Sequence, residues 1–113
     1  MSRGGPDPRR GEVWLIDFDP SIGGEIQKTR PAVVLSIDTA NTVLNRAQVV
    51  PISSQVDQLY PSEAAVMLNG QSRKAMADQL TTASKRRFLR RVGAITTADL
   101  GAVCRVVRQQ LGL

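Results

Sequence analysis

Three side chains suited to acid–base and anion-binding chemistry lie in the first half of the chain: Glu25, Arg30 and Ser53. Glu25 belongs to a segment, 18–29, whose Pro and Gly residues predict a loop. Arg30 leaves this loop just before Pro31, which opens a predicted strand, and Ser53 ends the next predicted strand. The start of one strand and the end of its antiparallel neighbour lie close together. If these two strands pair, we expect the three side chains to share one pocket.

Such a trio suits the cleavage of a phosphodiester without a metal ion. An arginine presents a planar fork of donors that grips a phosphate and stabilises charge as it builds on the oxygens. A serine hydroxyl can donate a further hydrogen bond to the same oxygens, and a carboxylate can remove a proton from a 2′-hydroxyl. Spacing alone also fits a simpler interpretation, in which Glu25 and Lys28 are solvated loop charges and Ser53 is an ordinary polar strand end.

The absence of histidine excludes several other chemistries. A nuclease that uses a histidine pair as acid and base is impossible, and so is a Ser-His-Asp or Cys-His triad. Cys104 is the one cysteine, so the chain lacks the ligands of a zinc site. Asp17 and Asp19 are a weak candidate for Mg²⁺, since acidic residues at a strand end are usually just solvated. We expect neither a metal nor another cofactor.

The bulk composition favours a polyanionic partner. The 113 residues suffice for one domain, which we assign to 9–113 after a flexible N-terminal tail at 1–8. A net charge of +5 and a sequence pI near 10.4 point towards nucleic acid, an acidic protein or a membrane surface, or else reflect a solvated basic surface. No apolar run approaches the roughly 18–20 residues of a membrane span, and the opening residues lack a signal-peptide core. We therefore expect a cytoplasmic protein that does not bind membranes.

Periodicity and turn residues predict short strands followed by one helix. The expected strands are 11–17, 31–37, 47–53, 63–68, 73–80 and 88–95, with a helical turn at 39–44 and a connection of small and basic residues at 81–87. Asn69-Gly70 is a strong hairpin signal, and Pro51 requires an edge or a bulge. The last helix should begin at Thr96 and end before Gly112. This order favours a small antiparallel sheet or barrel.

Several segments carry a resemblance to a known family. They are Gly11-Glu12-Val13-Trp14, Asp17-Phe18-Asp19-Pro20, Gly23, Glu25, Arg30-Pro31-Ala32-Val33-Val34-Leu35-Ser36, Val50-Pro51-Ile52-Ser53-Ser54, Tyr60-Pro61 and Ala77-Asp78-Gln79-Leu80. Together with the terminal helix they span nearly the whole chain after the tail. In this order and spacing they closely resemble the MazF/PemK (Kid) toxins.

The resemblance implies a dimeric, SH3-like antiparallel barrel with a C-terminal helix. It also implies sequence-specific, metal-independent cleavage of single-stranded RNA, leaving 2′,3′-cyclic phosphate and 5′-hydroxyl ends. By position, Arg30 matches the family's catalytic arginine and Glu25 its loop glutamate, while Ser53 stands where the family has a catalytic threonine. This last departure keeps the hydroxyl and loses the methyl group. Gly24-Glu25-Ile26 also departs from the commoner Ser-Glu-Gln.

Candidate RNA-binding residues lie beside the predicted site and in a run of basic residues further along the chain. They are Lys28, Thr29, Gln79, Lys85, Arg86 and Arg87, with Arg90, Arg91, Arg73 and Lys74 as a possible extension of the basic surface. Phosphate contacts of this kind give affinity and salt dependence rather than sequence choice. The same positive charge would equally suit a solubilising face, or the acidic segment of a cognate antitoxin.

Two other functions remain open from the sequence. A toxin of the same fold can act on gyrase without cutting RNA, although such a protein has no need of Glu25, Arg30 and Ser53. A binding-only barrel is the other alternative, although the scarcity of aromatic residues weighs against a base-stacking surface.

Overall fold

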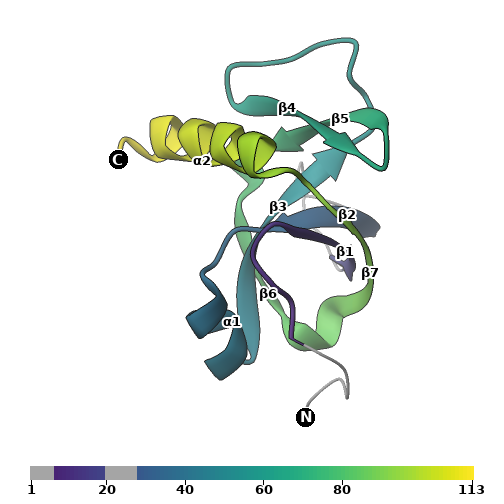
Figure 1. Ribbon diagram of the computed structural model, residues 1–113, viewed down its shortest axis with the longest axis vertical. Coiled ribbons are helices and arrows are strands. Elements are labelled where there is room, and N and C mark those ends of the chain that lie inside the picture. Colours follow the sequence, from purple (N-terminus) through teal and green to yellow (C-terminus); the bar gives the residue numbers. More distant parts are fainter. Residues whose placement is uncertain (1–6, 20–27) are drawn as a thin grey trace.

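The computed structural model describes residues 7–19 and 28–113, which form a curled antiparallel sheet and a C-terminal helix (Figure 1). The strands are β1 (Glu12–Asp17), β2 (Thr29–Val34), β3 (Arg46–Ser53), β4 (Glu63–Leu68), β5 (Gln71–Met76), β6 (Thr81–Ser84) and β7 (Phe88–Ala94). The helices are α1 (Asp38–Val43) and α2 (Thr97–Leu111), with single 3₁₀ turns η1 (Ala77–Gln79) and η2 (Lys85–Arg87). The expected antiparallel barrel with a terminal helix is confirmed, in the form of a half-barrel.

Strand β3 is the branch point of the sheet. The strand order is β4-β5-β3-β2-β1-β7, and β6 also pairs with β3. Residues 46–49 of β3 pair with β6, whereas Ile52 and Ser53 pair with β5. Pro51 falls between these two pairings, so on that side its missing N–H interrupts no ladder. Pro51 therefore lies at an interruption of the ladder, as its missing N–H requires, although it is fully buried and its other side faces Ala32 of β2.

The sheet buries a hydrophobic cluster on each face, because successive side chains of a strand point to opposite sides. Val13, Val33 and Ile52 belong to the cluster that packs against α2. Trp14, Ile16 and other alternate residues belong to the second cluster, in which the Trp14 and Phe88 rings meet edge to face at 5.7 Å. The aliphatic runs of β2 and β3 follow from this arrangement, since both strands contribute to both clusters.

The β4–β5 hairpin closes onto β7. Asn69 and Gly70 have φ of 52° and 78°, as a two-residue turn with positive φ at both central positions requires. The Asn69 side-chain amide donates a hydrogen bond of 3.0 Å to the carbonyl of Val92. A Cβ at Gly93 would lie 2.9 Å from the Asn69 Oδ1, so the hairpin approaches β7 where β7 has no side chain. The predicted turn at Asn69-Gly70 is confirmed.

Helix α2 begins and ends as its sequence predicts. The Thr96 hydroxyl accepts a hydrogen bond of 3.1 Å from the Asp99 amide, and Gly112 ends the helix with φ of 71°. The Asp99 carboxylate instead accepts a hydrogen bond of 2.9 Å from the Met67 amide on β4. The Asp99 side chain therefore connects the helix to strand β4 and does not complete a reciprocal capping box with Thr96.

Three predicted segments differ from the structure. The strand expected at 31–37 runs from Thr29 to Val34, the strand expected at 73–80 ends at Met76, and the segment expected as a connection contains β6. The residues of β6 are small and, except for the buried Ala83, polar, but pairing with β3 supplies their backbone hydrogen bonds. In the described part of the chain, no helix is long and apolar enough to cross a membrane.

The packed part of the chain includes two residues that the sequence assigned to the tail. Pro8 is fully buried, and the Asp7 carboxylate lies 2.7 Å from the Lys85 ammonium. Residues 1–6 of the expected tail lie outside the described residues.

Candidate functional site

Strands β2 and β3 pair, which is the condition that the sequence left open for a shared pocket. Their register matches Ala32 with Pro51 and Val33 with Val50. Extended by two residues beyond the Ala32–Pro51 pair, this register sets Arg30 opposite Ser53. The recorded ladder ends at the Ala32–Pro51 pair, so Arg30 and Ser53 lie just beyond its last pair. Glu25, the third member of the predicted trio, lies outside the described residues.

Ser53 is the last residue of β3 and has an exposed fraction of 7%. Its hydroxyl oxygen accepts a hydrogen bond of 3.1 Å from the Gln55 amide, which bends the chain away from the strand. That bond uses one of the two acceptor positions of the hydroxyl and leaves its proton free to donate. The hydrogen bond from Gln55 and the burial of the residue thus fix the position of the Ser53 hydroxyl at the end of β3.

Arg30 is the second residue of β2 and lies opposite Ile16 of β1. Its side chain is half-buried. Within residues 7–19 and 28–113, no hydrogen bond or ion pair engages its guanidinium group. A partly buried guanidinium with its donors available is suited to binding an anion.

Two hydrogen bonds join Lys28, which lies just before Arg30, to Phe18 and Asp19 just after the end of β1. The Lys28 amide donates to the Asp19 carboxylate at 2.8 Å, and the Phe18 amide donates to the Lys28 carbonyl at 2.8 Å. Lys28 has φ of 58°, a conformation that non-glycine residues adopt rarely. Thr29 lies opposite Asp17. Both Lys28 and Thr29 are exposed, beside the strand start that carries Arg30.

A buried ion pair lies beside Ser53 on the other side. Lys74 of β5 lies directly opposite Ser53, and its ammonium is 3.0 Å from the Glu63 carboxylate, with both side chains 9% exposed. The ammonium also donates to the Gln58 carbonyl at 3.0 Å and lies 5.5 Å from the centre of the Tyr60 ring. The sequence predicts Lys74 only as part of a possible basic surface, and no sequence signal identifies Glu63 as its partner.

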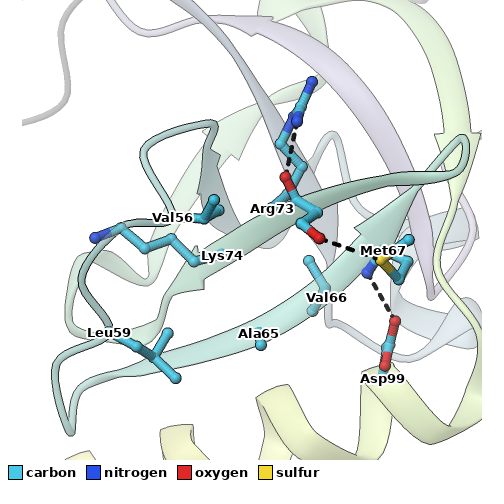
Figure 2. Close-up of a pocket in the computed structure, with 9 residues that line it drawn as sticks. Val56, Leu59, Ala65, Val66, Met67, Arg73, Lys74 and Asp99 are labelled. Carbon is cyan, nitrogen blue, oxygen red and sulfur yellow. Dashed lines mark hydrogen bonds between the residues drawn. The ribbon is translucent and has the colours of Figure 1, made fainter.

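A groove lies next to this pair on the β4–β5 hairpin (Figure 2). Its volume is about 410 Å³, and its lining includes Val56 and Leu59 of the preceding loop and Ala65 and Met67 of β4. Ala65 lies opposite Lys74, which in turn lies opposite Ser53. Directly paired residues point to the same side of a sheet, so the groove continues the face that carries Ser53.

The remaining predicted RNA-binding residues have different surroundings. Gln79 is half-buried in η1. Lys85 is paired with Asp7, and the Arg87 guanidinium donates to the backbone carbonyls of Asp17 and Asp19. Arg86 is exposed and, within the described residues, its side chain makes no hydrogen bond or ion pair. The three adjacent basic residues are therefore not equivalent.

Asp17 and Asp19 are the two residues that the sequence offered as weak candidates for a Mg²⁺ site. The Asp17 carboxylate accepts a hydrogen bond of 3.0 Å from the Asp19 amide, and the Asp19 carboxylate accepts one from Lys28. Both carboxylates thus take part in the local turn. Among residues 7–19 and 28–113, no three His, Cys, Asp or Glu side chains form a cluster able to hold a metal ion.

The described residues form a small antiparallel half-barrel with a C-terminal helix, and comparisons with known proteins identify its family. The model of the PemK-like, MazF-like toxins of type II toxin–antitoxin systems matches residues 9–111. Endoribonuclease MazF9 of Mycobacterium tuberculosis is 34% identical over 116 residues, covering 93% of this chain and 97% of the relative. Endoribonuclease toxin MazF of Escherichia coli K12 is 41% identical over 75 residues, covering 65% of each protein.

Solved structures show the same fold. MazF from Deinococcus radiodurans superposes with a TM-score of 0.86 at 27% identity, covering 96% of this chain and all of that one. A mycobacterial endoribonuclease in complex with its cognate antitoxin superposes with a TM-score of 0.78 at 20% identity, covering 94% and 96%. The chain belongs to the PemK-like, MazF-like toxin family of type II toxin–antitoxin systems.

Proposed function

We propose that this protein is an endoribonuclease toxin that cleaves single-stranded RNA at specific sequences without a metal ion. The observation that carries the proposal is the β2–β3 register, which brings Arg30 and Ser53 to the same end of neighbouring strands. The family, and relatives named as endoribonucleases, support the same activity.

In the proposed reaction, a 2′-hydroxyl of the RNA attacks the adjacent phosphorus. The Glu25 carboxylate takes the proton of that hydroxyl, a role that rests on the family resemblance. The bond from phosphorus to the 5′-oxygen breaks, and that oxygen takes up a proton from water. Arg30 and the Ser53 hydroxyl donate hydrogen bonds to the phosphate oxygens, where negative charge builds. The products are a 2′,3′-cyclic phosphate and a 5′-hydroxyl end.

RNA binding is proposed for Lys28, Thr29 and Gln79 near the site and for the basic run that begins at Lys85. The exposed guanidinium of Arg86 is the member of the run best able to contact a phosphate directly. Lys85 and Arg87 add positive charge to the surface while their side chains hold protein groups. Base recognition requires unstacked bases of a single strand, and we assign no residue to it.

Two further properties are proposed from the family. A cognate antitoxin with an acidic segment would neutralise the toxin, as the net charge of +5 and the antitoxin complexes of structural neighbours suggest. The active form would be a homodimer, acting in the cytoplasm, where RNA substrate is available.

The test is a cleavage reaction with EDTA present. Purified protein and its Arg30→Ala variant would be incubated with a long unstructured RNA, and the new ends would be mapped by sequencing. We expect discrete cuts with 5′-hydroxyl ends from the wild type, and a loss of about a hundredfold or more in the folded variant. Folded wild-type protein that cuts none of several RNAs of varied sequence would refute the proposal and favour gyrase-directed or binding-only action.

A further inference from the structure

Arg87 reaches from the second half of the chain to the end of β1. Its Nη1 donates a hydrogen bond of 2.9 Å to the Asp17 carbonyl and a second to the Asp19 carbonyl. Asp17 is the last residue of β1, and 70 residues separate it from Arg87 in sequence. Arg87 is half-buried in η2, so its guanidinium is directed at the backbone rather than into solvent.

These two carbonyls belong to the base of the β1–β2 connection. The Asp19 carboxylate accepts the hydrogen bond of the Lys28 amide, and the Lys28 carbonyl accepts that of Phe18. Asp17 lies opposite Thr29, the residue before Arg30. A shift of Asp17 and Asp19 therefore moves Lys28 and Thr29 with it, and these residues set where the Arg30 side chain leaves the sheet.

We propose that Arg87 is a positioning residue for RNA cleavage, which fixes Arg30 by clamping the end of β1 to the start of β2. The inference rests on the proposed nuclease function, and it gives Arg87 a different role from the phosphate contact that the basic run first suggested. Lys28 is held in a rarely populated backbone conformation, which persists where surrounding contacts enforce it. A displacement of about 1 Å at a catalytic group can lower a rate by about a hundredfold.

Arg86 is the matched control, since it is adjacent, has the same charge and lies outside this clamp. Cleavage would be measured in single turnovers at saturating RNA, and RNA affinity in the Arg30→Ala background across several salt concentrations. We expect Arg87→Ala to lower the cleavage rate by about 10- to 100-fold with little change in affinity or its salt slope. We expect Arg86→Ala to weaken RNA binding and to reduce the salt slope by about one, an effect on affinity that Arg87→Ala should not share.

The Arg87→Lys variant distinguishes the hydrogen bonds that Arg87 makes from the effect of its positive charge. A lysine keeps the positive charge, but its side chain is one bond shorter, so its ammonium stops short of the position from which Arg87 Nη1 reaches both carbonyls. We expect this variant to lose cleavage nearly as Arg87→Ala does. If Arg87→Lys cleaves like the wild type, or if Arg87→Ala acts on affinity in the manner of Arg86→Ala, the positioning role is wrong.

Amide hydrogen exchange tests the clamp without any need for cleavage. In Arg87→Ala we expect faster exchange at Phe18 and Lys28, whose amides hold the base of the connection, and unchanged exchange at Val33 in the middle of the sheet. Unchanged exchange at both Phe18 and Lys28 would overturn the proposal. If the wild type cuts no RNA, the proposed function fails, and exchange still decides whether Arg87 orders this segment.

Discussion

Ser53 and Lys74 lie directly opposite each other on β3 and β5, and the ammonium of Lys74 is bound to the Glu63 carboxylate at 3.0 Å. Lys74 lies on one side of Ser53, and the β2–β3 register, extended two residues past its last pair, sets Arg30 on the other side. Glu63 compensates the charge of Lys74. Arg30 is left as the cation beside Ser53 that has no compensating carboxylate among the described residues.

The Lys74–Glu63 pair should matter for stability. Removing one charge leaves the other buried without its partner, so Glu63→Gln is expected to lower the free energy of unfolding by about 3 kcal/mol. The double variant Lys74→Met with Glu63→Leu should recover most of that loss, because no buried charge remains. Urea unfolding of the two variants measures the difference.

An exposed ion pair provides the control. Arg9 and Asp38 lie 3.4 Å apart with side chains 70% and 43% exposed, so Arg9→Met should change stability by less than about 1 kcal/mol. Equal losses for Glu63→Gln and Arg9→Met would show that the buried pair contributes no more than a surface contact.

The Ser53 hydroxyl should be required for cleavage. Ser53→Ala removes one donor to the phosphate oxygens, and we expect the rate to fall about a hundredfold with the fold intact. Ser53→Thr keeps the hydroxyl and restores the residue type that the family resemblance implies, so it should stay within about tenfold of the wild type. Single-turnover rates on one RNA decide this, and a Ser53→Ala rate equal to the wild-type rate would remove Ser53 from the site.

Gly93 should tolerate no side chain. A Cβ there would lie 2.9 Å from Asn69 Oδ1 and 3.1 Å from a Leu68 methyl group, in the contact that closes the hairpin onto β7. We expect Gly93→Ala to lower stability by about 1–2 kcal/mol. Gly101→Ala meets open space on α2 and should raise stability by up to about 1 kcal/mol, as alanine favours a helix. Thermal unfolding of both variants tests the contrast, and a Gly93→Ala protein that unfolds at or above the wild-type temperature would contradict it.

Asp38 should make the protein sensitive to acid. The Arg10 amide, which donates to this carboxylate at 2.7 Å, holds the pKa of Asp38 below its ordinary value of 3.8. A group whose pKa is depressed by folding stabilises the folded state above its unfolded pKa and loses that contribution as pH falls through the folded pKa. We therefore expect the stability difference between wild type and Asp38→Asn to shrink as pH falls below 3.8. A difference independent of pH would exclude this contribution.

Strong local patterns were enough to predict much of the fold from the sequence. The aliphatic runs of β2 and β3, the Asn69-Gly70 turn and the Thr96 cap each have a local physical cause, and all are observed. Strand β6 was missed because its small polar residues acquire strand structure from pairing with β3. Whether β2 and β3 pair could not be predicted from the sequence, because no local pattern determines which strands become neighbours.

Long-range contacts account for what the sequence did not predict in the site. A run of three basic residues predicts a charged surface, but the 2.9 Å bond from Arg87 to the Asp17 carbonyl depends on how η2 packs beside β1. The pairing of Lys74 with Glu63 likewise requires β4 and β5 to lie side by side. Glu25 and its predicted role remain a prediction, since it lies outside the described residues.

The most direct test of the central claim is cleavage of a short RNA that contains the mapped cut site, with a matched RNA carrying one 2′-deoxy nucleotide immediately 5′ to the cut. The proposed mechanism uses that 2′-hydroxyl as its nucleophile, so we predict cleavage of the all-ribose RNA to a 2′,3′-cyclic phosphate and no cleavage of the substituted one. Cutting of both RNAs at the same bond and at similar rates would contradict the account.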